Sequence, residues 1–359
     1  YDISLGLVGS EMCIRDSFWT IRKRYEYIYK PVVFRTLLMA ALNAAIGVIA
    51  VLLTEEKGIA RILSCIFVNI CFGGVLFVYN LRKGKKLFCA EYAKFALLFN
   101  LPLLLHYFSQ YILDQFDRIM IQKMVDVSKA GIYSVAYNAG LIMKIVTQSI
   151  NNALVPWQYE QLEKKRMKEM GNHLFLIYIF VGGCALLFSA CAPEIIKILA
   201  DSKYYEAVYV IPPVAISMFF TFAYTSFANI EFFFDANKFT MFISMAGALL
   251  NIVLNYFGIL WFGYIAAAYT TLVCYVIFSI SHYVYMCHCI KKMSDTEEIF
   301  GTARLIFLMI LVLAGGILVI SLYDRPFLRY VLIIAACFIV YMKRKAVLSV
   351  ISNIRKKRG

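Results

Sequence analysis

Apolar residues occur in ten long blocks separated by short polar gaps. The blocks lie at about 32–54, 58–80, 91–116, 131–156, 173–192, 207–230, 239–258, 260–286, 302–322 and 326–342. Most have the length of roughly 20 residues that an α-helix needs to cross a bilayer. Lipid offers the backbone no hydrogen-bonding partner, so blocks of this kind form helices. The pattern therefore predicts an all-α polytopic membrane protein with about ten transmembrane helices.

Composition supports a membrane protein rather than a large soluble core. The chain of 359 residues is 62% hydrophobic and 16% charged, whereas a soluble domain is about 45–50% apolar and about 25% charged. The net charge is +14, and its cations alternate between the gaps. Gaps on the side of both termini, with their flanking cations, hold 24 Lys and Arg, and the opposite gaps hold 9. By the positive-inside rule both termini are cytoplasmic, and we expect no nucleic-acid partner.

One lysine lies in the middle of a predicted span. Outside the gaps and their flanks, the cations are Arg15, Arg35 and Lys144. Arg35 lies near a span end, where its side chain can reach the surface. Lys144 cannot, because about a dozen apolar-rich residues flank it on either side, and a lysine at mid-bilayer costs ~2.5–3.5 kcal/mol. We therefore expect Lys144 to face a partner or a wet cavity.

Two helical faces carry polar residues inside the membrane. Residues at i, i+4, i+7, i+11 and i+14 share a face; in the fourth block these are Tyr137, Leu141, Lys144, Gln148 and Asn151. The third block has a matching set in His106, Gln110, Asp114 and Asp117. Arg118 follows Asp114 by four residues, which predicts an ion pair between them.

Each of these polar groups has a structural alternative. Amide side chains such as Gln148 and Asn151 also join helices in membrane bundles. Asp114 and Asp117 are candidates for binding a coupling ion, H⁺ or Na⁺, although an Asp114–Arg118 pair would be structural. His106 is a weaker candidate and fits a packing residue better.

Other chemistry is absent from the sequence. It contains no G-x-S-x-G, P-loop or H-E-x-x-H motif. Cys287-His288-Cys289 lacks a second pair to complete a tetrahedral site, so we expect no metal. Glu231 and Asp235 fall near the end of a block, where a solvated loop explains both acids.

The two ends of the chain differ from the rest. Residues 11–17 resemble the translation of a sequencing adapter, so we expect 1–17 to be an artefact and the protein proper to begin near Phe18. At the other end, residues 343–359 alternate basic clusters with an apolar helical face. This pattern suits a helix on an anionic leaflet or a solvated tail.

A series of short motifs between residues 101 and 157 resembles a known family. The motifs are Leu101-Pro102-Leu103, Asp117-Arg118-Ile119-Met120-Ile121, Gly131-Ile132-Tyr133-Ser134, Ala136-Tyr137-Asn138 and Pro156-Trp157. In this order they resemble the Wzx-like oligosaccharide flippases, which are polysaccharide exporters of the multidrug/oligosaccharidyl-lipid/polysaccharide superfamily. The resemblance implies a remnant of a fourteen-helix, two-lobe transporter. Residues 18–80 would end the first lobe, 81–290 would form the second six-helix lobe, and 291–359 would hold two terminal spans and a basic tail.

The resemblance also implies a function, which is not enzymatic. Such a flippase moves oligosaccharide units linked to undecaprenyl diphosphate across the bacterial cytoplasmic membrane by alternating access, for surface polysaccharide such as O-antigen or capsule. Polysaccharide polymerase and chain-length machinery would be possible partners. Lys144 is then expected to contact the diphosphate and Arg118 to assist it. Gln148, Asn151 and Tyr137 would contact sugars.

Other functions remain open at this point. A multidrug or cation antiporter of the same superfamily would prefer acidic lining residues, so Lys144 argues against it. A lipid-II-type flippase shares the same physics. A membrane enzyme such as a polymerase is opposed by the short external gaps, and a structural scaffold has no need of Lys144.

Overall fold

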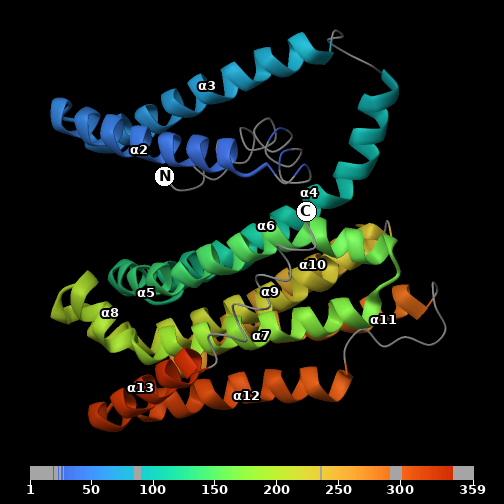
Figure 1. Ribbon diagram of the computed structural model, residues 1–359. Helices are drawn as coiled ribbons and strands as arrows, with labels where there is room; N and C mark the ends of the chain where they lie inside the picture. The colour runs from blue at the N-terminus through green and yellow to red at the C-terminus, as the bar shows by residue number, and fades with distance from the viewer. Residues whose placement is uncertain are drawn as a thin grey trace. The chain divides into compact units, whose positions relative to one another are not determined.

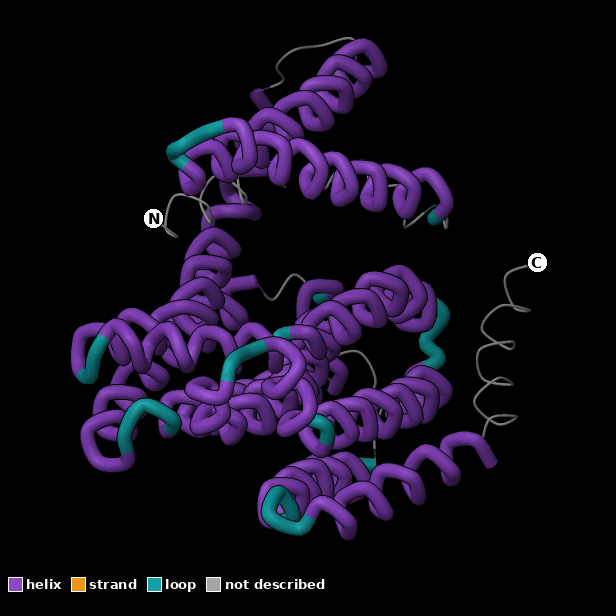
Figure 2. Tube along the Cα trace, turned by 90° about the vertical axis from the view of Figure 1, so that its left-hand side faces the viewer, coloured by secondary structure: helices purple, strands orange, loops and turns teal. Residues whose placement is uncertain are grey.

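The computed structural model describes residues 28–84, 90–234, 237–291 and 301–342, together with the isolated residues 19, 23 and 26. Within these residues the chain forms helices joined by short loops and turns, and no strand (Figures 1 and 2). It divides into two compact units, Tyr1–Leu97 and Leu98–Gly359. The predicted all-α fold is confirmed. The predicted artefact at 1–17 and the basic tail at 343–359 lie outside the described residues.

The first unit contains two helices that pack against each other, α2 (Lys30–Leu53) and α3 (Lys57–Gly84). A proline in the first turn of α2 suits a helix start, where its missing N–H is not needed. Gly47 is buried beneath the Arg61 side chain, and the Arg61 guanidinium donates to the carbonyl of Asn43 at 2.8 Å. A small residue thus lets an arginine of α3 lie against the backbone of α2.

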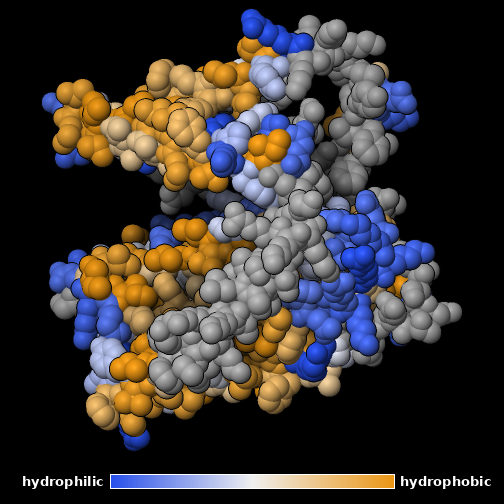
Figure 3. Space-filling model, viewed as in Figure 1, coloured by the Kyte–Doolittle hydropathy of each residue, from blue (hydrophilic) through white to orange (hydrophobic). Residues whose placement is uncertain are grey.

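Apolar side chains cover the outside of this pair. Leu52 and Leu53 of α2 are 78% and 82% exposed, and Val75 of α3 is 71% exposed. The space-filling view shows this orange surface over α2 and α3 (Figure 3). Apolar surface of this extent on a helix is expected where lipid, not water, is the solvent.

The second unit is built around one buried helix. Its elements are α4 (Ala90–Met124, which begins in the first unit), α5 (Val127–Gly140), α6 (Ile142–Glu163), α7 (Met167–Ala190), α8 (Ala192–Leu199), the short 3₁₀ helix η1 (Ser202–Val210), α9 (Ile211–Phe233), α10 (Asn237–Phe262), α11 (Ala266–Lys291), α12 (Thr302–Ser321) and α13 (Pro326–Met342). Helices α6, α7 and α11 pack around α9 (Figure 1). In the apolar window that includes α9, 89% of the residues are buried, and Phe219, Phe220 and Phe222 fill the core. A helix that is apolar on all sides belongs in the centre of a bundle.

The helices follow the ten predicted blocks with one break. Seven helical segments of the described chain are long and apolar enough to cross a membrane. The block at 131–156, predicted as one helix, is divided at Leu141 into α5 and α6. At this break Gly140 lies so close to α9 that an added Cβ would be 2.7 Å from the Val214 side chain. The chain is thus a multi-pass membrane protein whose fourth predicted span is interrupted beside Lys144.

Candidate functional site

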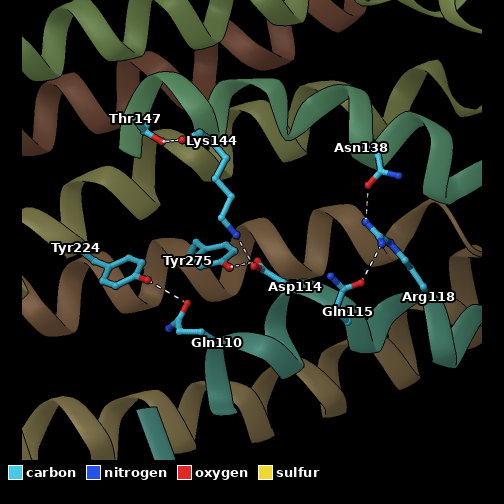
Figure 4. A network of polar contacts seen from close by, with 9 residues as sticks. All are labelled: Gln110, Asp114, Gln115, Arg118, Asn138, Lys144, Thr147, Tyr224 and Tyr275. Carbon is cyan, nitrogen blue, oxygen red and sulfur yellow. Dashed lines mark hydrogen bonds and ion pairs between the residues drawn. The ribbon is translucent and has the colours of Figure 1, made fainter. Parts of the chain in front are cut away.

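Lys144 of α6 forms an ion pair with Asp114 of α4 (Figure 4). The hydroxyl of Tyr275 on α11 donates to the other oxygen of Asp114 at 3.2 Å. Three helices therefore meet at one carboxylate. The expectation that Lys144 faces a partner is confirmed, and the partner is an acid 30 residues earlier in the chain.

The predicted ion pair between Asp114 and Arg118 is wrong. The Arg118 guanidinium donates instead to Gln115 at 2.9 Å and to Asn138 of α5 at 3.0 Å. It also lies over the ring of Tyr137, 4.8 Å from the ring centre. Helical spacing permits an i, i+4 pair but does not require one. The neighbouring helix offers Arg118 an amide acceptor and an aromatic face, so it does not turn to Asp114.

Asp117 lies on a buried face of α4. It is 0% exposed and accepts hydrogen bonds from the Tyr133 hydroxyl at 2.5 Å and from the Arg118 backbone N–H at 2.9 Å. The Asp117-Arg118 motif of α4 thus contacts the two tyrosine-containing motifs of α5. Asp117 faces Tyr133, and Arg118 faces Asn138. This cluster joins α4 to α5.

The Lys144–Asp114 pair is accessible, in contrast to Asp117. The Lys144 side chain is 31% exposed and the Asp114 side chain 20%. Both charges are therefore partly exposed, whereas the carboxylate of Asp117 is enclosed between α4 and α5. Of the two acids predicted to bind an ion, Asp114 lies at the open site.

The predicted polar face of residues 137–151 does not survive as one surface. Gln148 is exposed, but Tyr137 is 1% exposed. The Asn151 side chain accepts from Asn229 of α9 at 3.0 Å. Tyr137 lies at the end of α5, before the interruption at Leu141, and packs beneath Arg118 of α4. Asn151 takes the interhelical role that was its alternative.

The polar set of α4 is described only in part. Gln110 accepts a hydrogen bond from the hydroxyl of Tyr224 on α9 at 3.0 Å, one turn before Asp114 (Figure 4). His106 lies in α4, but its side chain is outside the described part of the structure. Its proposed role in ion coupling remains a prediction.

Two buried polar pairs were missed by the sequence analysis. The first joins Glu231 of α9 to His282 of α11, with both side chains 0% exposed. The expectation of a solvated loop at Glu231 is therefore wrong, and Asp235 lies outside the described residues. The second joins Arg329 of α13 to Glu194 of α8. Arg329 is 3% exposed, so Lys144 does not stand alone among the cations inside the helices. A histidine 51 positions from its acid gives no spacing signal, and Arg329 was taken as a flanking cation.

The structure shows no metal centre in its described part. No group of three or more His, Cys, Asp or Glu side chains gathers there in a way that could hold a metal ion.

The described helices are those of a multi-pass membrane protein, and two protein families match parts of the chain. Residues 29–162 match the family described as polysaccharide biosynthesis protein, and residues 102–257 match the MatE family. The two matches overlap over α4 to α6, where the motifs lie. Each match covers less than half of the chain, and both agree with the predicted resemblance to the polysaccharide exporters.

One curated protein is similar to part of the chain. The chain is 27% identical over 142 residues to protein 1 of the Lsg locus of Haemophilus influenzae. The match covers 39% of this chain and 35% of the relative, so the chain spans about a third of that protein's length. No solved structure matches the chain.

Proposed function

We propose that the protein translocates oligosaccharide units linked to undecaprenyl diphosphate across the bacterial cytoplasmic membrane, with Lys144 as the contact for the diphosphate. The observation that carries the proposal is the accessible ion pair between Lys144 and Asp114, held among three helices of a polysaccharide exporter. The translocated oligosaccharide units would be used to build a surface polysaccharide such as O-antigen or capsule.

Charge is the physical reason for a cation in this position. A diphosphate cannot enter hydrocarbon without compensation, because a charged group at the bilayer centre is strongly unfavourable. A lysine ammonium is a compact point charge with three donors that can turn toward an anion. Lys144 meets the requirement. Its side chain is partly exposed, and its partner on α4 is an acid, Asp114, that an anion can replace.

Asp114 then acts as an internal substitute for the substrate. When the diphosphate enters, Lys144 exchanges Asp114 for phosphate oxygens, and Tyr275 still donates to the released carboxylate. When the diphosphate leaves, Asp114 returns to Lys144. A charge that always has a partner keeps the cost of the site low in both states.

The other predicted contacts divide into two groups. Gln148 is exposed one turn beyond Lys144 and is proposed to bind sugar hydroxyls. Tyr137 and Asn151 are engaged with neighbouring helices, so we propose that they position α5 and α6. Arg118, engaged by Gln115 and Asn138, supports the same contact rather than the diphosphate directly.

Complementation tests the function. The encoding gene is introduced into a strain that lacks its own polysaccharide flippase, and surface polysaccharide is measured. Lys144→Ala is expected to abolish rescue and Lys144→Arg to retain part of it. Lys164→Ala is the matched control, because Lys164 is an exposed lysine of the same region that pairs only with Glu160. Rescue by Lys144→Ala at wild-type protein levels would overturn the site.

A further inference from the structure

A carboxylate and an imidazole face each other in the interior of the second unit. Nδ1 of His282 lies 3.0 Å from both carboxylate oxygens of Glu231, and both side chains are 0% exposed. The hydroxyl of Thr240 on α10 donates to one of the same oxygens at 3.1 Å. Ionisable groups inside membrane-spanning helices are costly and therefore mark functional sites more often than structural ones.

The second nitrogen of the ring has no partner in the described part of the structure. Nε2 of His282 is buried and makes no hydrogen bond to any described residue, whereas both oxygens of Glu231 are engaged. Nδ1 is committed to the carboxylate, so Nε2 is the atom at which a proton can be gained or lost. A buried donor or acceptor left unsatisfied costs free energy, which a purely structural pair would have no reason to retain.

The charge of the pair depends on that one proton. With Nδ1–H donating to ionised Glu231 and Nε2 bare, the pair carries one negative charge. When a hydronium ion from the aqueous side transfers its proton to Nε2, an N–H bond forms, an O–H bond breaks and water is released. The pair is then neutral overall, which a low-dielectric interior favours. When Nε2 gives this proton to a water molecule on the other side of the membrane, a hydronium ion forms and the pair returns to one negative charge.

The surroundings of the pair are mainly aromatic. The ring of Tyr224 from α9 stacks on His282 with centroids 5.4 Å apart, and Phe278 and Phe239 approach it at 6.1 and 6.2 Å. Tyr285 of α11 stacks on Phe239 with ring centroids 3.4 Å apart. Among the described residues, Tyr224, Tyr285 and Cys289 are the other titratable groups near the pair from α9 and α11, and α10 contributes Thr240 and Phe239.

A continuous series of contacts joins this pair to the Lys144 site. Tyr224 also stacks on Tyr275 with centroids 6.2 Å apart, and Tyr275 donates to Asp114. Tyr275 and His282 are seven residues apart on α11 and so lie on one helical face. A change in the charge of His282 can therefore reach Asp114 through two packed rings.

We propose that Glu231, His282 and Thr240 form a proton-binding site that couples proton movement to the exchange of Lys144 between Asp114 and an anionic substrate. The proposal deepens the transport function and rests on it for the coupling. Proton binding itself is independent of any substrate. The site relocates the ion-coupling role from Asp114, Asp117 and His106 to a pair that bridges α9 and α11.

The proton site is tested first without transport. The full chain, with ¹⁵N-labelled histidine, is placed in lipid nanodiscs, and the ring-nitrogen NMR signals are followed as the pH is cycled through the range in which imidazole titrates. Only four histidines are present, so the signal that His282→Gln removes identifies His282. We expect this signal to change reversibly between the neutral and the protonated pattern. A ring that stays in one state throughout would overturn the proposal.

The coupling is tested in proteoliposomes with a fluorescent undecaprenyl-diphosphate sugar and an imposed pH gradient. Wild-type protein is expected to move the lipid faster with the gradient. Glu231→Gln and the milder Thr240→Val are expected to lose this acceleration but still bind the lipid. The control is His173→Gln, because the ring of His173 lies apart from the pair, against the backbone carbonyl of Glu169 and the edge of Trp157.

The two possible failures give different results. If the wild-type protein moves no lipid under any gradient, the transport function fails, while the NMR signal still decides the proton site. If Glu231→Gln, eluting as a single folded species, keeps the full acceleration, the coupling through this pair is wrong.

Discussion

In the proposed function, Asp114 would limit how strongly Lys144 holds an anion, because it competes for the same ammonium group. Asp114→Asn keeps the shape of the side chain and removes the competing charge. We expect the affinity of the purified protein for undecaprenyl diphosphate to rise about tenfold, which is about 1.4 kcal/mol. Binding is measured by titration calorimetry in nanodiscs. The double variant Lys144→Met/Asp114→Asn should lose the gain, and unchanged affinity in Asp114→Asn would exclude competition.

Tyr133 supports the buried Asp117, and its loss should affect stability rather than binding. Tyr133→Phe removes the hydroxyl that donates to Asp117 at 2.5 Å and leaves that carboxylate short of a donor. An unsatisfied buried acceptor costs about 1–3 kcal/mol, so the melting temperature in detergent should fall. Tyr205→Phe serves as the control because Tyr205 is 39% exposed. An equal melting temperature for the two variants would contradict a supporting role.

The sequence identified the polar residues near Lys144 more readily than it identified the partners with which they form contacts. Lys144 was identified because a lysine among apolar residues is conspicuous in one dimension. Asp114 was identified too, but its partner was not, because Arg118 is close in sequence and Lys144 is close only after α4 and α6 pack. For Glu231 and His282 nothing in the local pattern differs from a polar helix end. Contacts between distant helices depend on packing, which periodicity does not encode.

At the scale of the helix, the polar residues of α6 fall into two groups, those bonded to α9 and those that are exposed. Asn151 is bonded to Asn229 of α9, which also donates to Gln158 of α6 at 3.1 Å, whereas Gln148 is exposed. Asn151→Ala should therefore lower the melting temperature with little change in affinity for the lipid-linked sugar. Gln148→Ala should do the opposite. Both quantities are measured on the same preparations, and a loss of affinity confined to Asn151→Ala would reverse the assignment.

The break between α5 and α6 was not predicted from the spacing of polar residues. The spacing rule assumes one continuous helix from Tyr137 to Asn151, but the close approach of Gly140 to Val214 places the end of α5 against α9. Helix α6 begins at Ile142, after the interruption at Leu141. Composition fixes the presence of an apolar segment, whereas the location of an interruption depends on which neighbour the helix meets.

At the scale of the whole molecule, the distribution of cations predicts the membrane topology, and the helix bounds show at which positions it can be tested. The loop between α6 and α7 contains Lys164, Lys165 and Arg166, and the segment following α8 contains Lys203 of η1 beside the acids Asp201 and Glu206. Cationic loops remain in the cytoplasm, and α7 is long enough to carry the chain across the bilayer between them. Alkaline phosphatase, which is active only outside the cytoplasm, should therefore be active when fused after Lys203 and inactive after Lys165, and fluorescent-protein fusions at the same positions should give the reverse. Alkaline phosphatase activity after Lys165 would show that the chain has the opposite orientation. The substrate would then approach the Lys144 site from the other side of the membrane.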